Sequence, residues 1–175
     1  MNPALKIPII IVLFFIFTLL QAGFLAYFAI AGQMINLIFI LFFVLIFFLK
    51  PDDYIQGFLI STAAGFFLDL LLPSYFGISI FILLLIFFIQ EASLHFLRQG
   101  QDKYPFFYFA SLFSACFILY GALMYVSSLL FHFSAHFGSD ILIGLVYNLL
   151  FASVGFFIYK KSHQQELGDN QLKLL

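Results

Sequence analysis

Long apolar runs separated by short polar connections extend along the whole chain. A helix needs about 20 mostly apolar residues to cross a bilayer, and six runs approach or exceed that length. The predicted spans are residues 7–30, 34–49, 54–72, 76–97, 105–131 and 140–159. We therefore predict an all-α integral membrane protein, with a six-span transmembrane domain over residues 1–161 and a short polar tail over residues 162–175.

Two of these spans allow an alternative interpretation. The second lies between Gln33 and Lys50 and is near the lower length limit for a spanning helix, so a re-entrant segment is the alternative. The first ends near Ala29-Ile30-Ala31, which resembles a signal-peptide cleavage site. Its apolar run is longer than the 7–15 residues usual in a signal peptide, which favours a permanent span.

Composition supports a membrane protein, and the placement of charge predicts its orientation. Hydrophobic residues make up 65% of the chain and charged residues 9%, against about 25% charged residues in soluble domains. This excludes a cytosolic enzyme, a nucleic-acid binder and a disordered scaffold. With six spans, all seven basic residues fall on one side of the membrane, which predicts that both termini are cytoplasmic. They are Lys6, Lys50, Arg98, Lys103, Lys160, Lys161 and Lys173.

The third predicted span carries a stripe of small and polar residues. Gly57, Ser61, Gly65 and Asp69 recur every four positions, so they share one face of a helix. Small residues at this spacing let a second helix approach closely. Asp69 lies about one turn before Pro73, near the predicted outer surface. The simplest interpretation is a packing stripe that ends in a hydrogen-bonding carboxylate, and the alternative makes Asp69 a proton or ligand site.

The sixth predicted span repeats the pattern with Gly144 and Asn148. An asparagine at this depth can hydrogen-bond to a neighbouring helix. Gln21 in the first span and Asn36 at the start of the second are candidates for similar intramembrane polar contacts. These residues are expected to pack helices or to bind a partner helix, and the sequence does not distinguish the two.

One histidine-containing group has the spacing of metal ligands. His132, His136 and Asp140 are four residues apart, and they would share a face if the segment were one continuous helix. Gly138 lies within this segment and argues against such a helix, so we expect no metal site.

The sequence also lacks a recognisable catalytic set. Glu91, His95 and Arg98 share a face near the inner end of the fourth span, where an interfacial charge cluster is the simplest interpretation. The zinc-protease motif HExxH and the hydrolase motif GxSxG are absent. Only one aspartate, Asp69, lies deep in a span, so an aspartate pair for intramembrane proteolysis is missing. We expect neither an enzyme nor a cofactor.

The most specific motif covers residues 57–77. Its order is a glycine-bearing helix, the step Leu68-Asp69-Leu70, a short turn from Pro73, and Gly77 before the next apolar run. This stretch resembles the family of the rod shape-determining protein MreD. Further similarities are the steps Leu20-Gln21 and Asn36-Leu37, Asn148, and the dibasic pair Lys160-Lys161. Ile35 stands where the family usually has proline.

The resemblance implies a non-enzymatic subunit of the rod complex, or elongasome, in the bacterial inner membrane. Such a subunit would bind the single-span protein MreC. Through it, the subunit would help to couple MreB filaments to a RodA-type peptidoglycan synthase and its transpeptidase, and so regulate cell shape. The family is similar in size and span count to the bundle of the S-components, which bind substrates for vitamin transporters. In that alternative Gln21, Asn36, Asp69 and Tyr75 would line an outer ligand pocket.

Overall fold

The protein is all-helical in the computed structural model, which describes residues 3–29, 33–49, 53–71, 75–101, 105–133, 138 and 140–172. A single 3-10 turn follows the first α-helix. In chain order the elements are α1 (Pro3–Gly23), η1 (Leu25–Phe28), α2 (Leu37–Phe47), α3 (Tyr54–Leu71), α4 (Ile78–Gln101), α5 (Pro105–Phe131) and α6 (Asp140–Leu172).

Three helical segments in the described part of the chain are long and apolar enough to cross a membrane. They are Tyr54–Leu71, Pro105–Phe131 and Ile141–Lys161. Three further apolar helical segments are shorter, namely Ile7–Gly23, Leu37–Phe47 and Ile78–Leu94. Length and composition therefore indicate a helical membrane protein, in which some segments are shorter than a full span.

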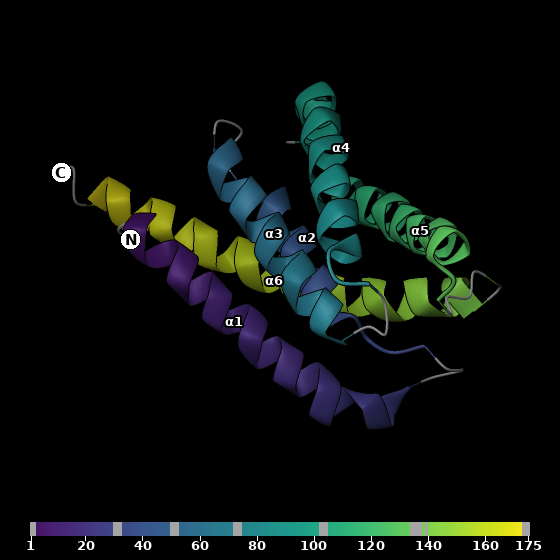
Figure 1. Cartoon of the computed structure of the whole chain (residues 1–175). Coiled ribbons are helices and arrows are strands. Elements are labelled where there is room, and N and C mark those ends of the chain that lie inside the picture. Colours follow the sequence, from purple (N-terminus) through teal and green to yellow (C-terminus); the bar gives the residue numbers. More distant parts are fainter. Residues whose placement is uncertain are drawn as a thin grey trace.

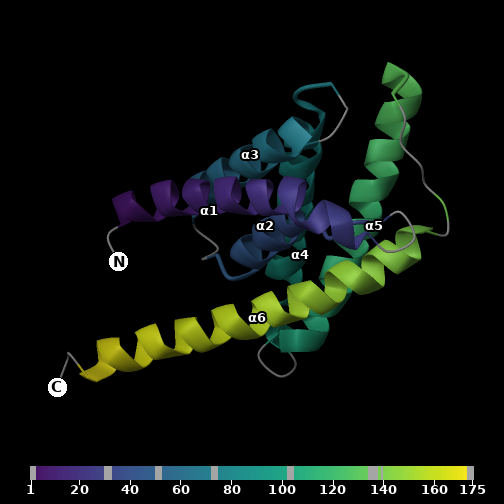
Figure 2. The same cartoon turned by 90° about the horizontal axis from the view of Figure 1, so that it is seen from below.

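The short helix α2 occupies the centre of the bundle (Figure 1). It packs against α1, α3, α4 and α6, and eight of its 11 residues are buried. Figure 2 shows α1 and α6 passing on either side of it, with the first helix starting and the last helix ending at the same end of the molecule. Because α2 is apolar all round, only a position enclosed by other helices buries it on every side.

The helical part of the second predicted span is too short to cross the hydrocarbon core. At 1.5 Å per residue α2 is about 16 Å long, about half of the roughly 30 Å thickness. The preceding residues 33–36 are not helical, and at an extended rise they would add about 13 Å. Within the second predicted span, residues 34–49, the helix therefore covers only Leu37–Phe47, and non-helical backbone precedes it.

Phenylalanine rings fill the space between α2, α5 and α6. Phe43 contacts Phe109 and Phe113 edge-on, with ring centroids 5.5 and 5.1 Å apart. Phe156 of α6 stacks into the same group, 4.8 Å from Phe109. Edge-to-face pairs place the positive ring edge against the negative face of a neighbour. Much of the high phenylalanine content therefore forms one interlocked core.

Other predicted boundaries also differ from the structure. α1 begins at Pro3 and ends at Gly23. The last part of the first predicted span forms η1 instead, a 3-10 turn with hydrogen bonds between residues three apart. At the other end of the chain α6 continues as a helix through the polar residues to Leu172.

Candidate functional site

The carboxylate of Asp69 joins the end of α3 to the start of α4. Its Oδ2 accepts a hydrogen bond of 2.7 Å from the backbone N–H of Gly77, and its Oδ1 accepts one of 2.9 Å from Ser79. The residue is only 6% exposed. The first N–H groups of a helix lack partners within the helix, and a negative charge there is favoured by the helix dipole. Asp69 therefore acts as a cap for α4.

Gly77 makes this cap possible through its backbone conformation. Its φ is +103°, a left-handed value that residues with a Cβ rarely adopt. A Cβ at this position would meet no atom within 4 Å, so space is not the constraint. The glycine is needed for the turn that aims its N–H at Asp69.

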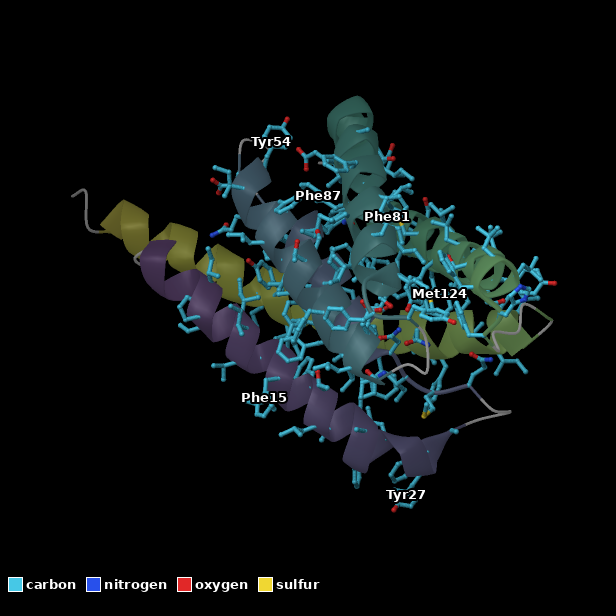
Figure 3. The ribbon with its side chains drawn as sticks, in the orientation of Figure 1. Phe15, Tyr27, Tyr54, Phe81, Phe87 and Met124 are labelled. Carbon is cyan, nitrogen blue, oxygen red and sulfur yellow. The ribbon has the colours of Figure 1, made fainter. Side chains whose placement is uncertain are left out.

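The remaining residues of the third-span stripe face α4. A Cβ on Gly65 would come within 2.7 Å of the backbone nitrogen of Ile80, so the two backbones are in close contact. A Cβ on Gly57 would lie 2.6 Å from Cζ of Phe87, whose ring lies between the two helices (Figure 3). Ser61 is fully buried, and its Oγ donates to the carbonyl of Gly57. The stripe is thus used for packing within the chain.

Asn148 of α6 ties the start of α2 into the bundle. Its Oδ1 accepts a hydrogen bond of 2.7 Å from the backbone N–H of Asn36, and its Nδ2 donates to the carbonyl of Gly144 at 2.8 Å. Asn36 in turn caps α2, because its Oδ1 accepts from the N–H of Phe39 at 3.0 Å. The structure thus brings Asn36 of the second predicted span together with Gly144 and Asn148 of the sixth.

A half-open pocket of about 160 Å³ lies beside this junction. The starts of α2 and α6, which border it, lie at the end of the bundle opposite the two termini (Figure 1). The pocket lies between the non-helical residues before α2, the C-terminal half of α5 and the start of α6. The lining residues are Gln33, Met34, Asn36, Phe117, Tyr120, Gly121, Gly138 and Ile141. Gly144 lies next to it, since a Cβ there would approach the Gln33 amide oxygen to 3.0 Å.

Two buried hydroxyl groups between the pocket and the Asp69 cap have no hydrogen-bond partner among the described residues. They belong to Tyr120 and Ser79. The Tyr120 hydroxyl interacts with the side chain of Ser79, without the geometry of a regular hydrogen bond, and it lies within electrostatic reach of Asp69. An unpaired buried hydroxyl is costly, and a water or ligand that bonded to it would remove that cost. Neither residue was identified from the sequence, because a lone tyrosine or serine in an apolar run gives no distinctive signal.

Two buried glutamines on different helices also have unused hydrogen-bonding capacity. Gln21 is 8% exposed, and its Oε1 has no partner in the described structure. Gln90 of α4 is fully buried, and its Nε2 donates to the carbonyl of Phe43 in α2 over 3.4 Å. Gln90 was missed, although a single amide at the end of the apolar run of the fourth span was a usable signal.

The structure does not assemble the remaining candidates into a site. Tyr75 is 60% exposed and does not line the pocket. α5 ends at Phe131, and His132 has a φ of 56°, so His132 and Asp140 do not share a continuous helix. Within the described ranges no group of three His, Cys, Asp or Glu side chains is placed to hold a metal.

Several other candidate side chains lie outside the described residues. They are those of His95, Arg98, His136 and Asp140.

Comparison with known proteins adds no relative. The chain matches no family model, no curated protein and no solved structure.

Proposed function

We propose that the chain is a non-enzymatic, six-span subunit of the rod complex, similar to MreD, in the bacterial inner membrane with both termini in the cytoplasm. The observation that carries this proposal is the structure formed by residues 57–77, the stretch on which the resemblance rests. The described residues of this stretch, 57–71 and 75–77, form a helical hairpin with the start of α4. Gly65 brings the two backbones into contact, and the carboxylate of Asp69 closes the hairpin at its turn.

This geometry favours a scaffold over a proton or ligand site at Asp69. Both carboxylate oxygens already accept backbone hydrogen bonds, at Gly77 and Ser79. Each such bond to a charged group contributes on the order of 1.5–3 kcal/mol, so releasing the carboxylate for another task would cost stability. A motif that holds two helices together suits a subunit whose task is to present helix surfaces.

The small-residue stripes are occupied within the chain, so a partner helix would meet the exposed apolar faces instead. On α1 the side chains of Phe15 and Leu19 are 52% and 58% exposed, and Figure 3 shows Phe15 pointing away from the bundle. In the proposed function such a face packs against the span of an MreC-like protein. Through that protein the subunit is linked to MreB and to a RodA-type synthase with its transpeptidase.

Affinity purification in mild detergent from the native membrane tests this proposal. The expected result is co-purification of an MreC-like single-span protein with elongation synthases. Replacing Phe15 and Leu19 with alanine is expected to reduce this recovery. The matched control replaces Phe157 and Ile158 on α6, which are similarly exposed at 56% and 66%. Recovery of transporter ATPases with a coupling subunit, and no elongation proteins, would contradict the proposal.

The presence of a pocket suggests a second candidate function, that of an S-component-like subunit of a vitamin transporter. Under the proposed orientation it faces the outside, as such a site requires. Its volume of about 160 Å³ is smaller than the roughly 300–1,000 Å³ of typical sites for larger ligands. Size therefore disfavours a vitamin as the occupant and makes this the weaker candidate.

A further inference from the structure

The non-helical backbone before α2 requires polar surroundings. Asn148 Nδ2 donates a hydrogen bond of 3.4 Å to the carbonyl of Met34. The segment before α2 therefore lies at the same depth as Asn148, which is inside the apolar part of α6, Ile141–Lys161. Irregular backbone at membrane depth is tolerated where it is buried in protein or lines a water-filled cavity. The pocket is lined by Gln33, Met34 and Asn36 of this segment, so it offers a cavity in which water could solvate this backbone.

Hydrogen-bonding groups with no partner in the described structure belong to three of the lining residues. The hydroxyl of Tyr120 has none. The side-chain oxygen of Asn36 caps α2, and its amide nitrogen donates to no described residue. The side chain of Gln33 touches the Gly144 position without a hydrogen bond. Two amides and a hydroxyl provide both donors and acceptors, as required to bind a carbonyl, amide or hydroxyl group.

The rest of the lining restricts the kind of occupant. None of the described lining residues is charged, so an ion that shed its water to bind there would find no compensating charge. Phe117 and Ile141 present apolar surface opposite the polar groups. A protein cavity of about 150 Å³ accepts a molecule the size of benzene, so this pocket has room for about six non-hydrogen atoms.

We infer that the pocket between the start of α2, α5 and α6 is a hydrated site that binds a small neutral molecule, with a hydrogen-bonding group held by Gln33, Asn36 and Tyr120. This goes beyond a role in the rod complex and does not depend on it. The uncharged, hydrogen-bonding lining indicates a neutral polar ligand, and the volume of about 160 Å³ limits its size.

The first experiment tests for water in the pocket. Met34→Cys and Val146→Cys are compared in a Cys116→Ala background, in the full-length chain in lipid nanodiscs. Val146 lies on α6 two residues from Asn148 and is 60% exposed, so it reports the lipid-facing surface near the depth of Met34. A charged methanethiosulfonate reagent should label Met34→Cys at least tenfold faster. Equal labelling rates would overturn the inference of a hydrated pocket.

The second experiment tests binding with 2-pyrrolidone, a neutral ring of six non-hydrogen atoms with one carbonyl and one N–H. At millimolar concentrations it should slow the labelling of Met34→Cys and leave Val146→Cys unchanged. Tyr120→Phe should weaken this protection by up to about tenfold, the effect of one lost hydrogen bond. Tyr54→Phe, at the other end of the bundle, should have no effect.

The outcomes of this second experiment separate a binding site from a structural hydroxyl. Tyr120→Phe removes a hydroxyl that makes no regular hydrogen bond in the described structure, so the variant should fold like the parent chain. Absence of protection by 2-pyrrolidone, or equal protection in the Tyr120→Phe and parent chains, would overturn the proposed site. Neither result would bear on co-purification of rod-complex proteins.

Discussion

The side chain of Asn148 accepts a hydrogen bond from the backbone N–H of Asn36, a residue 112 positions earlier in the chain. The contact joins the last helix to the start of the central one, and Asn148 is only 1% exposed. Asn36 in turn caps α2. These two asparagines therefore hold the point where the chain changes from non-helical backbone to helix.

Replacing Asn148 with leucine should lower the free energy of unfolding by about 1–3 kcal/mol, because the buried N–H of Asn36 loses its acceptor. The measurement is unfolding in mixed micelles followed by circular dichroism. Ser153→Ala is the control. The Ser153 hydroxyl bonds only to Leu149 in its own helix, and its loss should cost less than about 0.5 kcal/mol. Equal effects of the two changes would contradict this role of Asn148.

Asp69 should tolerate asparagine better than leucine. Asparagine keeps one acceptor oxygen for Gly77 or Ser79, so the free energy of unfolding should fall by about 1–2 kcal/mol. Asp69→Leu leaves both N–H groups without their acceptor and should lower it by about 3 kcal/mol. The same unfolding assay measures the order. Normal stability of Asp69→Asn together with loss of partner co-purification would instead identify a functional carboxylate.

Gly65→Leu should disrupt the hairpin of α3 and α4. Even a methyl group there would come within 2.7 Å of the Ile80 nitrogen, so the helices must separate, at a cost of about 2–3 kcal/mol. Phe66→Leu, on the next position and 41% exposed, should cost far less. Folded yield after size-exclusion chromatography compares the two variants, and equal yields would count against the close approach.

Gly77→Ala tests the turn before α4. A left-handed backbone costs a residue with a Cβ about 1–2 kcal/mol, so stability should fall by that amount although the site is open. Gly138→Ala is the matched control, since Gly138 is equally open and lacks a positive φ. Unchanged stability of the Gly77→Ala variant would show that the turn can be made without glycine.

Orientation can be measured directly with reporter fusions. Fluorescent fusions to either end of the chain should both be active in the cytoplasm, since the start of α1 and the end of α6 lie at the same end of the molecule (Figure 2). An external C-terminus would rule out the six-span orientation.

The spacing of small residues was sufficient to predict which of them share one face of a helix. The spacing of Gly57, Ser61 and Gly65 predicted a helix-packing face, and the structure places α4 against it. A hydrogen-bonding role for Asp69 also followed, because a carboxylate in an apolar helix must find a partner. Such features can be predicted because local spacing fixes the face of a helix on which a residue lies.

The features that depend on distant contacts were not predictable in the same way. Hydropathy does not distinguish a half-helix from a full span, so the length of α2 was missed. Its start is set by Asn148, which no local pattern connects to Asn36. The pocket likewise arises where three segments meet, and its tyrosine, Tyr120, has no neighbouring polar residue in the sequence to mark it.

The position of α2 has a consequence for how the chain is made. Gln90 of α4 donates to the carbonyl of Phe43 in α2, and Asn148 of α6 secures the start of that helix. Both partners are synthesised after α2 and reach the membrane later. α2 is therefore inserted before the helices that complete its hydrogen bonds. It can reach its final packing only after α4 and α6 have been inserted.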